Sequence, residues 1–79
     1  MAWSDEPTET QIGALFNFIQ WKLPRDEAVH AVKWLQENST RRDVSYELKR
    51  VRELFTQRKL TKESCFESDI WEGYEYDGS

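Results

Sequence analysis

The residues best suited to catalysis or metal binding are few in this sequence. His30 is the only histidine and Cys65 is the only cysteine. His30 follows Asp26 by four residues, a helical spacing that predicts a weak surface pair, and no second His or Cys is present to complete a metal site. Lys62 lies near Cys65 in "KESCFES", but no base is placed to activate the thiol, so we expect a buried or unreactive cysteine.

Other catalytic patterns are missing from the sequence as well. It contains no glycine-rich phosphate loop and no Ser-His-Asp set, and none of its carboxylates shows the apolar flanking typical of a general acid. We therefore expect no enzymatic activity, no metal, no cofactor and no small-molecule substrate. One cysteine cannot build a disulfide framework, which favours a reducing, cytoplasmic location.

Composition and charge are those of a small globular domain. With 38% hydrophobic and 33% charged residues, the 79-residue chain is too aromatic for a disordered segment and has no apolar run long enough to cross a membrane. The net charge of −4 is unevenly divided: residues 1–10 carry −3, residues 11–40 carry 0, residues 41–62 carry +5 and residues 63–79 carry −6. The acidic start also lacks the pattern of a signal peptide.

Basic side chains gather on one side of the segment 41–59. Arg42, Lys49 and Arg52 fall beside its core face at helical spacing. Three roles are open for them: a solvated face, a contact with an acidic protein surface, or phosphate contacts by the recognition helix of a helix-turn-helix. Glu47 and Glu53 interrupt the basic patch, and the acidic tail would repel DNA, so nucleic acid ranks below protein as a partner.

The tail alternates acidic and apolar residues in "ESDIWEGYEYDGS", which includes Trp71 and Tyr74. Three states are open for it: folding back onto the basic helix, binding a partner as a short docking motif, or disorder.

Capping and proline signals predict three helices, over residues of about 8–22, 24–38 and 41–59. Thr8 and Gln11 form a capping box, and Pro24 suits the first turn of the second helix. Thr40 with Asp43 marks the start of the third helix. No stretch alternates as a strand would, so we expect an all-α fold, a small three-helix bundle.

Three parts of the chain are predicted from this pattern. Residues 1–7 form a flexible acidic N-terminus, residues 8–62 form the bundle, and residues 63–79 form the tail, with a short fourth helical turn within residues 62–72. Apolar residues at helical spacing predict the core of each helix. The core residues expected are Ile12, Leu15, Phe16, Ile19 and Leu23 in the first helix, Ala28, Ala31, Val32 and Leu35 in the second, and Val44, Leu48, Val51 and Phe55 in the third.

The first helix carries a second apolar stripe, formed by Ala14, Phe18 and Trp21. Two stripes indicate that this helix is covered on two sides. Either the tail covers the second stripe with Phe66, Ile70, Trp71 and Tyr74, or Phe18 and Trp21 form a docking patch for another protein or a second copy of this chain.

Part of the sequence resembles the second and third helices of ubiquitin-associated domains. Ala28, Ala31 and Val32 in "LPRDEAVHAVKWL" match the family's A-x-x-A-Φ pattern (Φ is apolar), and Val44 and Leu48 in "RRDVSYELKRV" match its N-V-E-x-A pattern. The family's Met-Gly-Phe loop would fall on residues 21–23, which contain no glycine, and the middle helix is about one turn too long. The chain is therefore not assigned to that family.

The sequence thus predicts a small intracellular helical protein that acts by binding another protein, as an adaptor, inhibitor or regulator would. The alternative is a nucleic-acid-binding helix-turn-helix that uses the third helix. The residues expected to contact the partner are Phe18, Trp21, Trp34, Arg42, Lys49, Arg52, Trp71 and Tyr74.

Overall fold

The computed structural model describes residues 4–77 and confirms the all-helical three-helix bundle. Its elements, in chain order, are α1 (Glu9–Ile19), α2 (Arg25–Asn38) and α3 (Arg41–Thr56), followed by two short 3-10 helices, η1 (Ser64–Phe66) and η2 (Asp69–Trp71). The described part of the chain contains no strand. Where one fourth helical turn was predicted, the tail forms these two turns.

The predicted helix starts agree with the structure. The Thr8 hydroxyl accepts a hydrogen bond from the Gln11 amide, and the Gln11 side chain accepts one from the Thr8 amide, which completes the capping box. The Thr40 hydroxyl caps α3 by accepting from the Asp43 amide. Each cap satisfies backbone amides that have no partner within the helix.

Two helices end earlier than the sequence predicted. α1 stops at Ile19. The Ile19 carbonyl accepts hydrogen bonds from the amides of Lys22 and Leu23 in the following turn. α3 stops at Thr56, because Arg58 adopts a left-handed conformation with φ of 59°. The amide of Arg58 then donates to Phe55, and the next amide donates to Leu54, the two hydrogen bonds of a Schellman motif.

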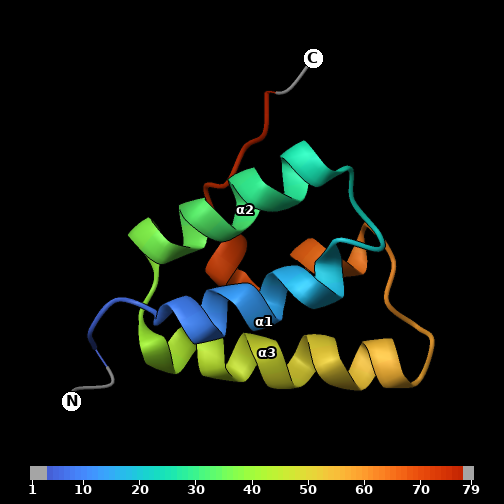
Figure 1. The fold of residues 1–79 in the computed structure, drawn as a ribbon, viewed down its shortest axis with the longest axis horizontal. Helices are drawn as coiled ribbons and strands as arrows, with labels where there is room; N and C mark the ends of the chain where they lie inside the picture. Colours follow the sequence, from blue (N-terminus) through green and yellow to red (C-terminus); the bar gives the residue numbers. More distant parts are fainter. Residues whose placement is uncertain (1–3, 78–79) are drawn as a thin grey trace.

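The helices α1 and α3 lie side by side and run in the same direction (Figure 1). α2 packs on the side of α1 that faces away from α3, and the tail lies behind α1. At one end, the Gln11 side chain donates to the Arg41 carbonyl at 3.3 Å. At the other end, the rings of Phe18 and Phe55 are 5.3 Å apart. These contacts fix the register of the two helices.

The segment before α1 is attached to the start of α3. The Arg41 amide donates to the Asp5 carbonyl at 2.9 Å, the Arg41 side chain donates to the Glu6 carbonyl at 3.0 Å, and Pro7 is buried. Residues 5–7 are therefore held in place, whereas the sequence predicted a flexible segment. Residues 1–3 of that prediction lie outside the described part.

The core follows the predicted stripes closely in α1 and α2. All four predicted core residues of α2 are buried, and Leu15, Ile19 and Leu23 are buried from α1 and the turn after it. In α3 the prediction is partly wrong, because Phe55 is 39% exposed and Glu47 is only 2% exposed. Leu60, Cys65 and Trp71 from the segment after α3 complete the core.

Candidate functional site

An apolar groove runs along the outside of the bundle between α1 and α3. Its apolar lining comes from the second stripe of α1, through Ala14 and Phe18, and from Leu48 of α3. The groove has a volume of about 820 Å³, and Lys49 and Arg52 line it from α3. Here the two helices run side by side without a third helix to cover them, so the groove follows from the parallel pairing of α1 and α3.

The apolar surface continues past the end of α3. Phe55 packs its ring against Phe18 and lines a second hollow together with Leu60, Lys22 and Arg58. Thr56 lines both hollows. Sequence periodicity assigned Leu48 and Phe55 to the core. Phe55 is instead exposed on this surface, whereas Leu48, like Phe18, packs partly buried against the core and also lines the groove.

Trp21 is the most exposed large hydrophobic residue of the described chain, with 68% of its surface accessible. It lies in the turn directly after α1. An indole ring left in water forgoes the free energy of burial, about 25 cal/mol for each Å² of apolar surface. Trp21 therefore contributes little to the stability of the isolated chain and is accessible to a partner.

The charge around the groove is mainly positive. Lys49, Arg52, Lys22 and Arg58 line the groove and its continuation, against one acid, Glu53. Within residues 4–77, the ion pairs are Glu47–Arg50 and Glu27–Lys62, and neither includes any of these four cations. Arg42 lies near the start of α3, away from these four cations. Its guanidinium is 5.9 Å from the centre of the Tyr46 ring.

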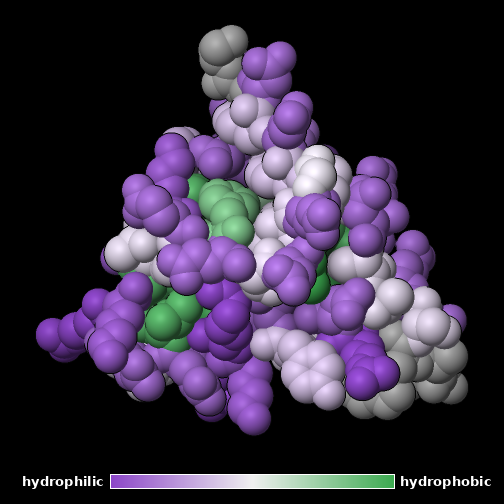
Figure 2. Space-filling model, turned by 180° about the vertical axis from the view of Figure 1, so that it is seen from behind, coloured by the Kyte–Doolittle hydropathy of each residue, from purple (hydrophilic) through white to green (hydrophobic). Residues whose placement is uncertain are grey.

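The tail does not cover the second stripe of α1, so that interpretation was wrong. It packs instead on the opposite side of the bundle, where Trp71 stacks on Trp34 of α2 with ring centres 6.2 Å apart. Phe66 and Tyr74 pack edge-on against the same Trp71 ring. The face seen from this side is largely hydrophilic, with hydrophobic residues in small patches (Figure 2).

Three of the predicted contact residues therefore belong to an aromatic cluster made of Trp34, Phe66, Trp71 and Tyr74. Trp71 is only 5% exposed, and Trp34 and Tyr74 are half-buried beside it. The cluster attaches the tail to α2. The structure separates these residues from Phe18, Lys49 and Arg52, which line the groove between α1 and α3.

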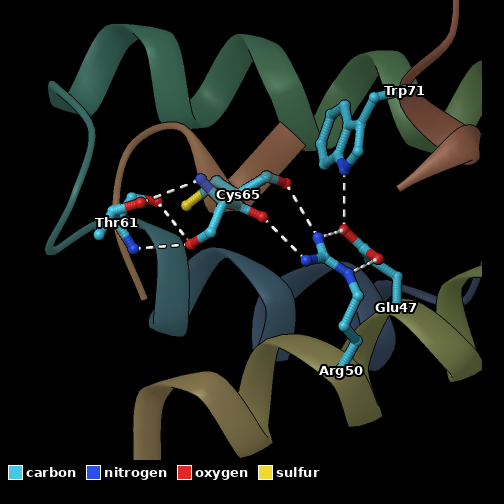
Figure 3. Close-up of polar contacts among 6 residues, drawn as sticks. Glu47, Arg50, Thr61, Cys65 and Trp71 are labelled. Carbon is cyan, nitrogen blue, oxygen red and sulfur yellow. Dashed lines mark hydrogen bonds and ion pairs between the residues drawn. The ribbon is translucent and has the colours of Figure 1, made fainter. Parts of the chain in front are cut away.

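A buried polar network attaches the tail to α3. The Glu47 carboxylate forms two hydrogen bonds with the Arg50 guanidinium, at 2.8 and 2.6 Å, and accepts a third from the Trp71 indole at 2.8 Å (Figure 3). The same guanidinium donates to the carbonyls of Ser64 and Cys65 in η1. The hydrogen bond with Glu47 is the main cause that raises the pKa of Arg50. A charged pair is tolerated here because each partner has several hydrogen bonds.

One interpretation of the sequence was that the acidic residues of the tail pair with the basic face of α3. Within residues 4–77 they form no such ion pair. The tail folds back through Trp71 and the η1 carbonyls, which bind Glu47 and Arg50. Sequence reasoning treated Glu47 only as an interruption of a basic patch. Its spacing within the inward face of α3, between Val44 and Val51, was the signal that it could be buried.

Cys65 and His30, the two residues best suited to catalysis or metal binding, both have structural contacts. Cys65 is fully buried, and burial raises the pKa of its thiol to about 11. The His30 ring nitrogen Nδ1 lies 3.1 Å from the Tyr74 hydroxyl, in place of the predicted pairing with Asp26. Burial also raises the pKa of Tyr74 to about 12, so this phenol stays uncharged.

Residues 4–77 contain no group of three or more His, Cys, Asp or Glu side chains arranged to hold a metal ion. None of the helices in that range combines the length and the apolar character needed to cross a membrane. Comparisons with protein-family models, with curated proteins and with solved structures found no match to this chain.

Proposed function

We propose that this chain acts inside the cell by binding another protein, and that the groove between α1 and α3 is the binding surface. The observation that carries the proposal is the apolar lining by Ala14, Phe18 and Leu48, flanked by Lys49 and Arg52 that have no acidic partner within the described residues. A contiguous apolar surface with polar residues at its edge is typical of a protein-binding site.

The occupant that best fits the groove is an amphipathic helix with acidic residues beside its apolar face. α1 has 11 residues and α3 has 16, which gives lengths of about 16 and 24 Å. A partner helix of three to four turns would lie along them and complete a helical bundle. Acidic side chains on that helix would meet Lys49 and Arg52 at the edge of the groove.

Phe55 extends the same surface beyond the groove, and Trp21 is a further exposed aromatic residue in the turn after α1. Phe55 touches Phe18, and Trp21 follows α1 with most of its indole accessible. Aromatic residues of this size commonly dominate the free energy of protein binding. Contact with phosphates of nucleic acid would leave Phe18, Leu48 and Phe55 without a role, so protein is the better-supported partner.

Two synthetic helical peptides test the proposal. They share one apolar face, but one carries glutamates and the other lysines beside it, and binding is followed by backbone amide chemical shifts. We expect the glutamate peptide to bind and to shift residues of the groove. The double variant Lys49→Glu/Arg52→Glu should weaken this binding by about tenfold or more and improve binding of the lysine peptide.

The matched control is Lys33→Glu/Lys59→Glu, which makes the same charge change at exposed positions outside the groove. It should leave the preference for the glutamate peptide intact. If neither peptide shifts the groove residues, or if the two double variants weaken binding equally, the groove is not the binding surface. Binding of duplex DNA with a steep loss as salt rises would instead favour the nucleic-acid alternative.

A further inference from the structure

A third hollow lies on the opposite side of the molecule, between the start of α2 and the tail, and shares no lining residue with the groove. Its volume is about 840 Å³. Aromatic rings and carboxylates dominate its lining, which consists of Pro24, Asp26, Glu27, Lys62, Phe66, Trp71, Tyr74, Tyr76 and Asp77. Three carboxylates against one ammonium make the hollow unsuited to anions.

Glu27 in this hollow lacks the hydrogen bonds that a buried carboxylate normally has. The residue is only 8% exposed, and within residues 4–77 its carboxylate accepts no hydrogen bond. In that part of the chain, its one polar contact is the Lys62 ammonium, at 3.7 Å. No fully buried side-chain oxygen of the described residues is left without a partner, so the oxygens of Glu27 keep access to the hollow.

Lys62 shows that the hollow accepts a cation. Its ammonium lies beside Glu27, although 58% of the Lys62 side chain is exposed. A contact this long on an exposed lysine contributes little to stability. An external cation could therefore replace the lysine at Glu27 at small cost, and it could form the hydrogen bonds that Lys62 does not.

The rings around the hollow favour a flat cation over a compact one. Trp71 and Tyr74 are fixed by their mutual packing and by the His30 contact with the Tyr74 hydroxyl. Trp71 is only 5% exposed, so Tyr74 offers the accessible ring. A guanidinium can stack on such a ring and also donate two parallel hydrogen bonds to one carboxylate, whereas an ammonium cannot do both. We propose that this hollow binds a guanidinium group, held by the Glu27 carboxylate and the aromatic rings of the tail.

The test compares a guanidinium with its neutral isostere. N-acetyl-arginine amide and N-acetyl-citrulline amide are titrated into the labelled protein, and chemical shifts of the Trp71 indole and of residues 24–28 are followed. We expect saturable shifts with the arginine compound and none with citrulline. Glu27→Gln, which keeps the shape of the side chain, should abolish the binding.

Two lysine variants provide the sharper comparison. Lys62→Gln removes the competing cation and should tighten binding of the arginine compound by about two- to fivefold. Lys59→Gln removes an exposed lysine that does not line the hollow, and should leave the affinity unchanged. If Glu27→Gln does not fold, the comparison of these two lysine variants decides the matter.

Equal shifts with citrulline, or equal effects of the two lysine variants, would overturn the proposal. Two further probes identify the source of the guanidinium. Agmatine that binds as well as N-acetyl-arginine amide indicates a small free guanidine, while an arginine-containing peptide that binds tenfold tighter indicates a protein side chain. Each of these results requires the same site at Glu27.

Discussion

The indole Nε1 of Trp71 donates a 2.8 Å hydrogen bond to the carboxylate of Glu47, which lies 24 residues earlier in the chain. Both residues are buried, with 5% and 2% of their surface exposed. This contact joins the tail to α3 from inside the core. It makes the tail part of the folded domain and leaves the groove on the other side uncovered.

Replacement of Trp71 by Phe removes the indole donor but retains an aromatic ring in the cluster. We expect the free energy of unfolding to fall by about 1–3 kcal/mol, because one bond to a buried carboxylate is lost and the smaller ring packs less well. Urea denaturation measures this change. Unchanged stability would show that the hydrogen bond does not hold the tail, and Tyr46→Phe, at an exposed ring, is the control.

Removal of one partner of the Glu47–Arg50 pair should cost more than removal of both. Arg50→Met leaves a buried carboxylate with the indole as its one remaining donor, and we expect a loss of about 3–5 kcal/mol. Glu47→Met/Arg50→Met removes both charges and should be more stable than Arg50→Met. Thermal unfolding of both variants and of Glu47→Met checks the non-additivity. Additive losses would contradict the description of this network as a coupled unit.

Trp21→Ala should leave the stability of the isolated chain within about 0.5 kcal/mol of the parent, because the side chain is 68% exposed. Leu15→Ala, at a fully buried position on the same helix, should cost about 2–5 kcal/mol. Chemical denaturation of the two variants side by side makes the comparison. A large loss in Trp21→Ala would mean that the indole belongs to the core.

Stability should decline in alkaline solution. The pKa of Cys65 rises from 9.0 to about 11 on folding, so between these values the unfolded chain loses its thiol proton while the folded chain keeps it. The unfolded state then binds fewer protons, and the free energy of unfolding falls as pH rises. Tyr74 acts in the same direction over a higher range, from 10.0 to about 12.

The variant Cys65→Ala isolates the thiol contribution. Its stability deficit relative to the parent, measured by urea denaturation, should shrink between pH values of about 8 and about 10.5. A deficit that stays constant over this range would show that the thiol has the same pKa in both states.

The sequence was sufficient for the architecture and for the core of α2, because small and branched residues at regular spacing leave one inward face. It was insufficient for α3, where periodicity places Phe55 inside and the charge of Glu47 suggests that this residue stays outside. That inference assumes a carboxylate stays in water. Here Arg50 and the distant Trp71 supply the hydrogen bonds that make its burial tolerable.

The end of α3 illustrates a second gap between sequence and structure. Helices often stop at a glycine in the left-handed conformation, but this one stops at Arg58, which carries a side chain. No local residue type marked that position. The predicted contact residues lie on two separate surfaces. Helical spacing correctly grouped Lys49 and Arg52, but the position of Trp71 and Tyr74 depended on where the tail packs, which spacing does not predict.

The late position of Trp71 in the chain has a consequence for synthesis. Translation proceeds at about 5–20 residues per second, so the 24 residues that separate Glu47 from its indole partner take about 1–5 s to add. Until Trp71 has been added, the Glu47 carboxylate lacks its indole donor and the core lacks the side chains that the tail contributes. An incomplete chain with exposed apolar side chains is a substrate for chaperones and proteases, so the time needed to add Trp71 sets the minimum length of that exposure.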